Sequence, residues 1–175
     1  LAHDGHGAPS MCLLRFATLY GLSPRMRFDL TVNEFTMELL TRHKIALYGE
    51  QFWRPYVHVG DAARAIHLVL HAPADVVADE AFNVGDASQN YQKGQLADLV
   101  RARIGDHVHI ERVHRAEDPR DYRVAFDKIQ QRFGFRVTRT VDAGVCEIIE
   151  ALSTGVIADP EHPRYRNTGG LRQLT

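Results

Sequence analysis

The sequence has few cysteines, no long apolar run and almost no net charge. Its two cysteines, Cys12 and Cys146, lie far apart outside any CxxC spacing, so we expect neither a disulfide framework nor a zinc site. The net charge of −1 gives no basic surface for nucleic acid. The apolar runs are too short for a signal peptide or a membrane span. We therefore predict a protein of the reducing cytoplasm, with neither nucleic acid nor membrane as a partner.

The composition is that of an ordinary globular domain. The chain has 175 residues, of which 45% are hydrophobic and 25% are charged. It begins with leucine, and residues 1–9 resemble the end of a helix followed by a loop. We therefore expect the chain to be a piece of a longer protein.

Short strands and helices are predicted to alternate along the chain. Residues 11–20 are an apolar run that is closed by Gly21, which predicts a buried strand of a parallel sheet. After Asp61, a natural helix N-cap, apolar residues follow at helical spacing as far as Leu70. The other expected helices lie at about 30–42, 96–104, 128–133 and 140–155, and the other expected strands at 45–48, 55–59, 81–85 and 107–113.

This alternation predicts the α/β class. The expected strands are too few for a complete doubly wound domain, so the pattern indicates part of a sheet with an appended lobe. Residues 1–157 form the predicted unit. Residues 158–175 are polar and contain Pro160, Pro163 and the pair Gly169–Gly170, which predicts a loosely ordered tail.

Two segments together carry a resemblance to a known family. The first is LRFATLYG at residues 14–21 with SPRM at 23–26, and the second is YGEQFWRPYVHVGDAARA at 48–65. With FNVG at 82–85 and residues 122–135, they resemble the extended short-chain dehydrogenase/reductases of the NAD-dependent epimerase/dehydratase family, such as UDP-glucose 4-epimerase. The resemblance covers nearly all of residues 10–155. It implies the C-terminal part of a doubly wound NAD(P)-binding fold plus the small substrate-binding lobe.

Two motifs that the resemblance calls for are missing from the sequence. No G-x-G-x-x-G turn, which would receive the pyrophosphate of a dinucleotide, is present. No Tyr-x-x-x-Lys pair is present either, because the fourth residue after each of the six tyrosines is Pro24, Phe52, Gly60, Gln95, Phe126 or Gly169. The resemblance therefore implies that NAD is bound mainly by a preceding part of the protein, and that no catalytic residue lies in this chain.

The resemblance implies that Arg54 grips the diphosphate of a sugar nucleotide, because a guanidinium makes two parallel hydrogen bonds to phosphate oxygens. Arg115 lies where epimerases carry a second such arginine, and Arg120 and Arg123 are nearby alternatives. Arg54 could instead be a surface arginine stacked on Trp53. The arginines from 115 onwards could instead belong to a solvated run of alternating charge.

The remaining implied contacts come from shorter side chains. Thr18 stands where many relatives carry an asparagine that contacts the substrate, and a buried threonine bonded to backbone is the alternative. Asn33 and Asp29 lie at a loop–helix junction facing the nucleotide, although Asp29 could be only an N-cap. Phe16 and Leu19 lie where relatives pack against the nicotinamide end of the cofactor, and core packing explains them equally well.

Three functions remain open from the sequence. The first is an NAD-dependent sugar-nucleotide epimerase or dehydratase, which the paired arginines favour, and its longer form could be a homodimer. The second is an extended NAD(P)-dependent carbonyl reductase, whose more apolar pocket Phe52 and Trp53 would fit. The third is a divergent, non-catalytic member of the family.

Overall fold

The computed structural model describes residues 11–118 and 120–167, so the predicted loop at residues 1–9 and the end of the predicted tail lie outside the described residues. No helix in these two ranges is long and apolar enough to cross a membrane. The elements are, in order, β1 (Cys12–Phe16), β2 (Thr18–Tyr20), α1 (Thr31–Arg42), β3 (Lys44–Tyr48), β4 (Trp53–His58), α2 (Val59–Leu70), α3 (Ala74–Val77), β5 (Glu80–Val84), β6 (Asn90–Gln92), α4 (Lys93–Ile104), β7 (His109–Val113), α5 (Asp127–Phe133) and α6 (Val141–Ser153), with short 3₁₀ turns at Ala87–Gln89 and Pro163–Tyr165.

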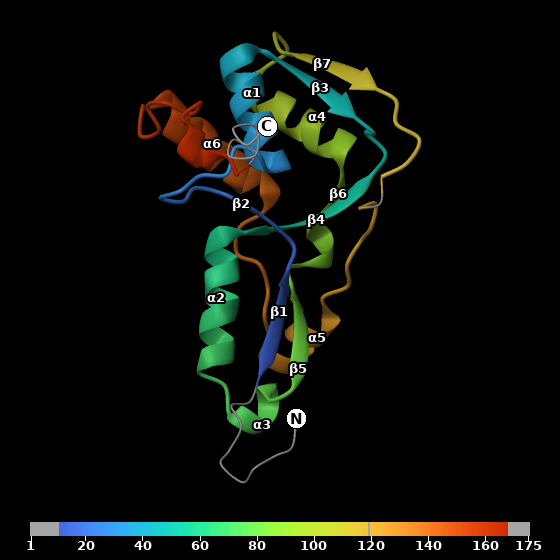
Figure 1. The fold of residues 1–175 in the computed structure, drawn as a ribbon, viewed down its shortest axis with the longest axis vertical. Coiled ribbons are helices and arrows are strands. Elements are labelled where there is room, and N and C mark those ends of the chain that lie inside the picture. Colours follow the sequence, from blue (N-terminus) through green and yellow to red (C-terminus); the bar gives the residue numbers. More distant parts are fainter. Residues whose placement is uncertain (1–10, 119, 168–175) are drawn as a thin grey trace, which may run out of the picture.

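The molecule is elongated, with a lower and an upper lobe (Figure 1). In the lower lobe β1 pairs in parallel with β5, next to α2 and α5. In the upper lobe β3 pairs in parallel with β7, next to α1 and α4, and α6 packs against α1. The sheet β2–β4–β6 lies between the lobes, with β2 parallel and β6 antiparallel to β4. Parallel strand pairs joined through helices confirm the predicted α/β class.

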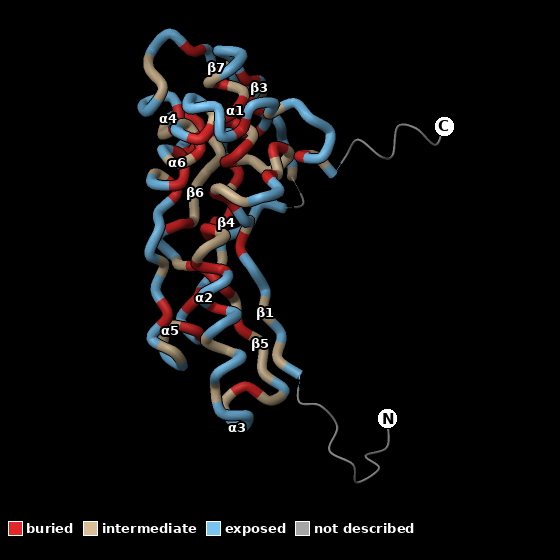
Figure 2. The backbone as a smooth tube through the Cα atoms, turned by 90° about the vertical axis from the view of Figure 1, so that its left-hand side faces the viewer, coloured by how far each residue is buried: buried red, intermediate tan, exposed pale blue. Residues whose placement is uncertain are grey.

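Each lobe has an apolar core, and Figure 2 shows buried stretches along the length of both. The upper core includes Leu39 of α1, Leu47 of β3 and Leu96 of α4. The lower core includes Val57 at the end of β4 and Phe82 of β5. Because β4 contributes Tyr56 to the upper core and Val57 to the lower one, this strand connects the two lobes.

The apolar run at residues 11–20 forms two strands in different sheets. The chain divides at Ala17, where β1 ends beside β5 and β2 begins beside β4. The prediction of one buried strand is wrong for β1, because Leu13 is 60% exposed and Phe16 is 39% exposed. Within the described residues β1 has a neighbouring strand on one side only, and this leaves an apolar edge open.

Residues 158–167 differ from the loosely ordered tail that composition predicted. Tyr165 is buried, and its ring meets that of Phe28 edge to face, with centroids 5.7 Å apart. The carbonyl of Tyr165 also accepts a hydrogen bond of 2.9 Å from the backbone N–H of Phe28. One buried aromatic ring is enough to anchor a short polar segment. A domain boundary at residue 157 stays a prediction.

Helix α2 begins three residues earlier than predicted, and Asp61 is not its N-cap. The cap is His58, whose Nδ1 accepts a hydrogen bond of 3.0 Å from the backbone N–H of Gly60. Asp61 is fully buried and binds the segment that leads into α6. Its carboxylate accepts hydrogen bonds from the backbone N–H groups of Thr138 and Arg139, at 2.9 and 3.0 Å, and from the Thr138 hydroxyl at 2.7 Å. Arg64 adds an ion pair of 2.6 Å.

We expect Asp61→Ala to lower the free energy of unfolding by about 3–5 kcal/mol, because it leaves buried donors without their charged acceptor. Urea unfolding measures the change. The matched control is Asp106→Ala, which removes an ion pair with Arg101 from a side chain that is 95% exposed. That change should cost about 0–1 kcal/mol. Equal effects of the two substitutions would contradict a structural role for Asp61.

The Asp61 carboxylate should also make the free energy of unfolding depend on pH in the acidic range. Burial alone would raise the pKa of Asp61, but the hydrogen bonds from Thr138, Arg139 and Arg64 outweigh it and hold the pKa below its usual value. The stabilisation is therefore present above the unfolded pKa of about 3.9 and is lost as the pH falls through the lower, folded pKa. In Asp61→Ala this part of the acid dependence should be absent.

Candidate functional site

Arg54, the first of the predicted ligand contacts, lies in β4 and is 8% exposed. Its Nη1 donates hydrogen bonds to the carbonyls of Trp53, at 2.7 Å, and of Arg120. Its Nη2 donates to Oδ2 of Asp118 at 2.6 Å. Its Nε hydrogen and its second Nη2 hydrogen have no partner among the described residues. The guanidinium is therefore held firmly, with donors left over for a ligand.

Asp118, in the irregular segment after β7, is the counter-ion at this site. Its side chain is only 5% exposed. A backbone hydrogen bond of 2.9 Å from Arg120 is the main cause that lowers the pKa of Asp118, and the charge of Arg54 lowers it further. A cleft of about 370 Å³ opens beside Asp118, and its wall also contains Phe52, Ala116, Glu117 and Asp121. Asp118 could not be predicted from the sequence, because a carboxylate in a run of alternating charge carries no signal of its own.

The structure brings Arg115 and Arg120 to the same region as Arg54. Arg120 reaches Oδ1 of Asp118 through its Nε at 3.4 Å, and most of its side chain is exposed. Arg115 is exposed, and its carbonyl accepts a hydrogen bond of 2.7 Å from the side chain of Gln51, in the turn before β4. Arg54, Arg115 and Arg120 with Asp118 are called the arginine cluster below. Their contact with a ligand stays a prediction.

Asn33 and Leu19 lie together in the wall of a second cleft, of about 200 Å³, with Arg25 and Arg27. Oδ1 of Asn33 accepts a hydrogen bond of 3.1 Å from the backbone N–H of Gly21, and its Nδ2 donates to the carbonyl of Arg27 at 3.3 Å. The backbone groups of Gly21 and Arg27 therefore supply the polar partners of the Asn33 side chain, so that it does not need a ligand for this purpose. Asn33 therefore fixes the wall of the cleft, and a direct ligand contact stays a prediction.

The remaining predicted contacts lie at several places. Asp29 forms a two-pronged ion pair with Arg27, with distances of 2.7 and 2.9 Å, and this pair is the main cause of its lowered pKa. It is not an N-cap, since α1 is capped by Leu30 without a side-chain bond. Thr18 is half-buried in β2, where it pairs with Tyr56. Phe16 and Leu19 are more than one-third exposed, so core packing does not account for all of their apolar surface.

A buried histidine fixes the loop that forms the second cleft. His58 accepts from Gly60 through Nδ1, so its Nε2 carries the hydrogen and donates to Glu147 of α6 at 2.8 Å. Glu147 also accepts from the backbone N–H of Leu22 at 3.0 Å. Gly21 has a φ of +104°, and a Cβ there would lie 2.2 Å from the imidazole. The glycine after β2 is thus required by the close approach of His58.

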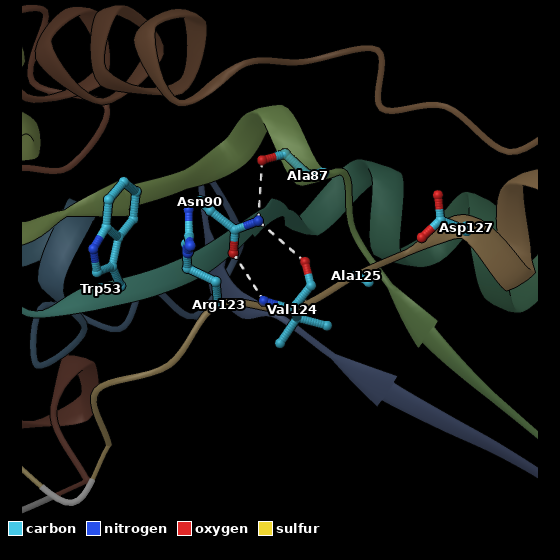
Figure 3. Close-up of a pocket in the computed structure, with 7 residues that line it drawn as sticks. All are labelled: Trp53, Ala87, Asn90, Arg123, Val124, Ala125 and Asp127. Carbon is cyan, nitrogen blue, oxygen red and sulfur yellow. Dashed lines mark hydrogen bonds between the residues drawn. The ribbon is translucent and has the colours of Figure 1, made fainter.

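Figure 3 shows a broader cleft, of about 550 Å³, where the segment after Tyr122 crosses β4 and β6. The Asn90 side chain donates to the carbonyls of Ala87 and Val124, and it accepts from the N–H of Val124. The guanidinium of Arg123 lies 4.9 Å from the centre of the Trp53 ring. The cation–π contact predicted for Arg54 is therefore made by Arg123.

Comparison with known proteins finds a matching family model and similar folds. Residues 2–85 match the model of the NAD dependent epimerase/dehydratase family. The fold resembles that of UDP-glucose 4-epimerase from Thermotoga maritima, solved with UDP-glucose, at a TM-score of 0.68 and 23% identity, covering 82% of this chain and 46% of that one. It also resembles dTDP-glucose 4,6-dehydratase from Streptomyces venezuelae, solved with NAD, at a TM-score of 0.69 and 21% identity, covering 84% and 45% of the two chains.

A third similar structure is an NAD-dependent NDP-hexosamine 5,6-dehydratase involved in tunicamycin biosynthesis. Its TM-score is 0.73 at 18% identity, and the match covers 89% of this chain and 50% of that one. At these identities the likeness shows a shared Rossmann-like fold. The match to the NAD dependent epimerase/dehydratase family model includes the two segments, 14–21 and 48–65, that carry most of the resemblance in the sequence. The chain spans about half the length of the solved structures that it matches.

Proposed function

We propose that this chain is the substrate-binding part of an NAD-dependent sugar-nucleotide epimerase or dehydratase, and that its arginine cluster receives the diphosphate. The observation that carries the proposal is the pairing of two arginines, Arg54 and Arg120, with the nearly buried carboxylate of Asp118. Arg115 lies exposed in the same segment of the chain as Arg120. A guanidinium that already binds one carboxylate can still donate its remaining N–H groups to the oxygens of a diphosphate.

The match to the family model supports NAD as the cofactor of the whole protein. NAD would supply the chemistry, by taking a hydride from the sugar and returning it. In this chain only Phe16 and Leu19 are proposed to contact it, through apolar surface that is exposed in the structure. The part that this chain plays is to bind and orient the nucleotide sugar.

A carbonyl reductase finds less support. That alternative needed Phe52 and Trp53 to line an apolar pocket. Phe52 is 5% exposed and is packed against Gly49, and the Trp53 ring is covered by Arg123. Both residues line clefts, but those clefts also contain charged side chains, with Asp118 and Asp121 beside Phe52 and with Arg123 and Asp127 beside Trp53. Such walls suit a steroid or flavonoid less well than a polar ligand.

Calorimetric titration with UDP and with uridine tests the proposal. We expect UDP to bind at least about tenfold more tightly than uridine, because charged hydrogen bonds contribute roughly 1.5–3 kcal/mol each. Arg115→Ala should remove much of this difference. The matched control Arg101→Ala, which changes an exposed arginine paired with Asp106, should leave it intact. Equal affinities for UDP and uridine in the unaltered protein would refute the diphosphate site.

A further inference from the structure

The surface around β1 holds most of the exposed apolar side chains of the lower lobe, and Figure 2 shows β1 at the margin of that lobe. Edge strands are normally protected by charges or proline, but β1 has no proline and a single charged residue, Arg15. Nine large apolar side chains are exposed within the described residues. Five of them lie on β1, just before it, or on α2, which contacts β1, and they are Met11, Leu13, Phe16, Ile66 and Leu70.

The backbone of β1 also has bonding groups that face away from its partner. The N–H of Ala17, at the end of β1, donates to the carbonyl of Val84 of β5 at 3.0 Å. Backbone groups point to the two sides of a strand in alternation, so those of Leu14 and Phe16 point to the open side. Within the described residues no strand lies on that side. The open side of β1 is therefore able to pair with one further strand.

An apolar cleft of about 410 Å³ lies between β1 and α2. Its wall is formed by small and apolar residues without a charge, among them Cys12 and Leu14 of β1 and Ile66, Val69 and Leu70 of α2. Parallel sheets are normally covered by helices on both faces. The shape and chemistry of this cleft therefore suit the apolar face of a further helix packed next to α2.

A single structural unit supplies both features. A strand that adds to a parallel pair is joined to its neighbours through a crossover, which is usually a helix. Two strands alone make a marginal sheet, and a third strand with a covering helix is the usual way in which such a sheet becomes stable. A strand and a helix that follow one another in sequence would thus pair with the open side of β1 and fill the cleft.

The position of Phe16 indicates which part of the protein carries this unit. Phe16 ends β1, and ligands of open α/β sheets bind outside the carboxyl ends of the strands. The proposed function puts NAD against the exposed rings and chains of Phe16 and Leu19, so the part that binds NAD has to lie along the same edge. The matches to the three solved structures cover only 45% to 50% of those chains, which leaves a second half large enough for such a unit.

We propose that the open side of β1 and the apolar cleft beside α2 form the docking surface for a strand and a helix of the dinucleotide-binding part of the protein. This inference rests on the proposed function, which assigns NAD to that part. The strand pairs with β1 in parallel, and the helix lays its apolar face on Leu14 and Leu70. Arg15 is exposed and has no ion pair within the described residues, so a carboxylate of the docked part is expected to face it.

Hydrogen exchange tests the strand pairing. The amides of Leu14 and Phe16 should exchange at least about a hundredfold more slowly in a protein that also carries a dinucleotide-binding part than in the chain alone, because they become bonded to a neighbouring strand. The amide of Leu13 points towards β5 and should be protected in both proteins. Equal exchange of Leu14 and Phe16 in the two proteins would overturn the proposal.

Leu70→Lys tests the cleft. Leu70 is 75% exposed, so the chain is expected to fold with a lysine in its place. In the chain alone the variant should bind less of the dye anilinonaphthalene sulfonate, which reports exposed apolar surface. In the longer protein it should speed exchange of the Leu14 and Phe16 amides at least about tenfold. The matched control is Val156→Lys, because Val156 is 73% exposed and lies outside the cleft. Equal effects of the two substitutions would count against the docking surface.

Two further measurements separate the alternatives. Sedimentation of the chain alone tests a second copy as the occupant, and a stable dimer that Leu70→Lys dissociates and Val156→Lys does not would assign the surface to that copy and overturn the proposal. Titration with UDP and uridine tests the proposed function by itself. If the Leu14 and Phe16 amides are protected but UDP is not preferred, the docking surface stands and the nucleotide function is refuted. If UDP is preferred but these amides stay unprotected, the reverse holds.

Discussion

Supplied with NAD and either UDP-glucose or dTDP-glucose, this chain is expected to turn over neither sugar nucleotide. Proton transfer in the family requires a tyrosine whose pKa is lowered by a lysine four residues later, and the sequence contains no such pair. Three tyrosines of this chain have a raised pKa instead. Burial is the main cause that raises the pKa of Tyr20 and Tyr91 and takes the pKa of Tyr56 to about 12. A buried phenol with a raised pKa is a poor proton acceptor near neutral pH.

The measurement is a coupled assay for the epimerised or dehydrated sugar, run over hours with the chain in excess. Loss of a general acid–base group alone typically costs 10²- to 10⁴-fold in rate, and a missing cofactor site removes the hydride transfer as well. We therefore expect product at the level of a control without protein. Sustained turnover by the chain alone would show that a residue within it performs the chemistry.

The second large effect is expected for Arg54→Ala in a protein that also carries a dinucleotide-binding part. UDP affinity should fall about ten- to hundredfold, because a charged donor of roughly 1.5–3 kcal/mol is lost, while NAD affinity stays nearly unchanged. Arg54→Lys should recover only part of the loss, since an ammonium cannot reproduce a planar fork. Calorimetric titration with UDP and with NAD measures both affinities.

The structure adds a control for this experiment. Arg54→Ala also removes the ion pair of Arg54 with the nearly buried Asp118, which keeps only its contacts with Arg120, and removes a donor from two carbonyls, so some loss of stability is expected. The double variant Arg54→Ala/Asp118→Asn removes the charge of Asp118 as well. If the double variant regains stability but not UDP affinity, Arg54 contacts the ligand. If UDP affinity returns together with stability, the role of Arg54 is structural, and the carbonyl reductase becomes the better hypothesis.

Local signals in the sequence identified most of the elements. The apolar stripe from Ala62 to Leu70 predicted α2. The helix expected at 140–155 is α6, and Thr140 accepts the hydrogen bond from the N–H of Ala143 that caps it. Such patterns depend on residues three or four positions apart, so they can be read along the chain. The motifs also indicated the family that the chain resembles, because motifs keep their residue types and spacing even where the overall sequence identity is low.

The site itself depends on contacts between residues far apart in the sequence. Arg54 was predicted as a ligand contact, but its ion pair with Asp118 spans 64 positions and no local pattern indicates it. Asp61 had the spacing of a helix cap and proved instead to bind the segment before α6 from within the core.

The sequence by itself determined the α/β class, the order of helices and strands, the family motifs, and the absence of the Tyr-x-x-x-Lys pair from this chain. The tertiary structure decided where the run at residues 11–20 divides, which carboxylate meets Arg54, and which cations share one site. The physical reason is that helix caps and apolar periodicity act over a few residues, whereas strand pairing and electrostatics depend on distance in space. That distance is set only when β4 and the segment after β7 have packed together.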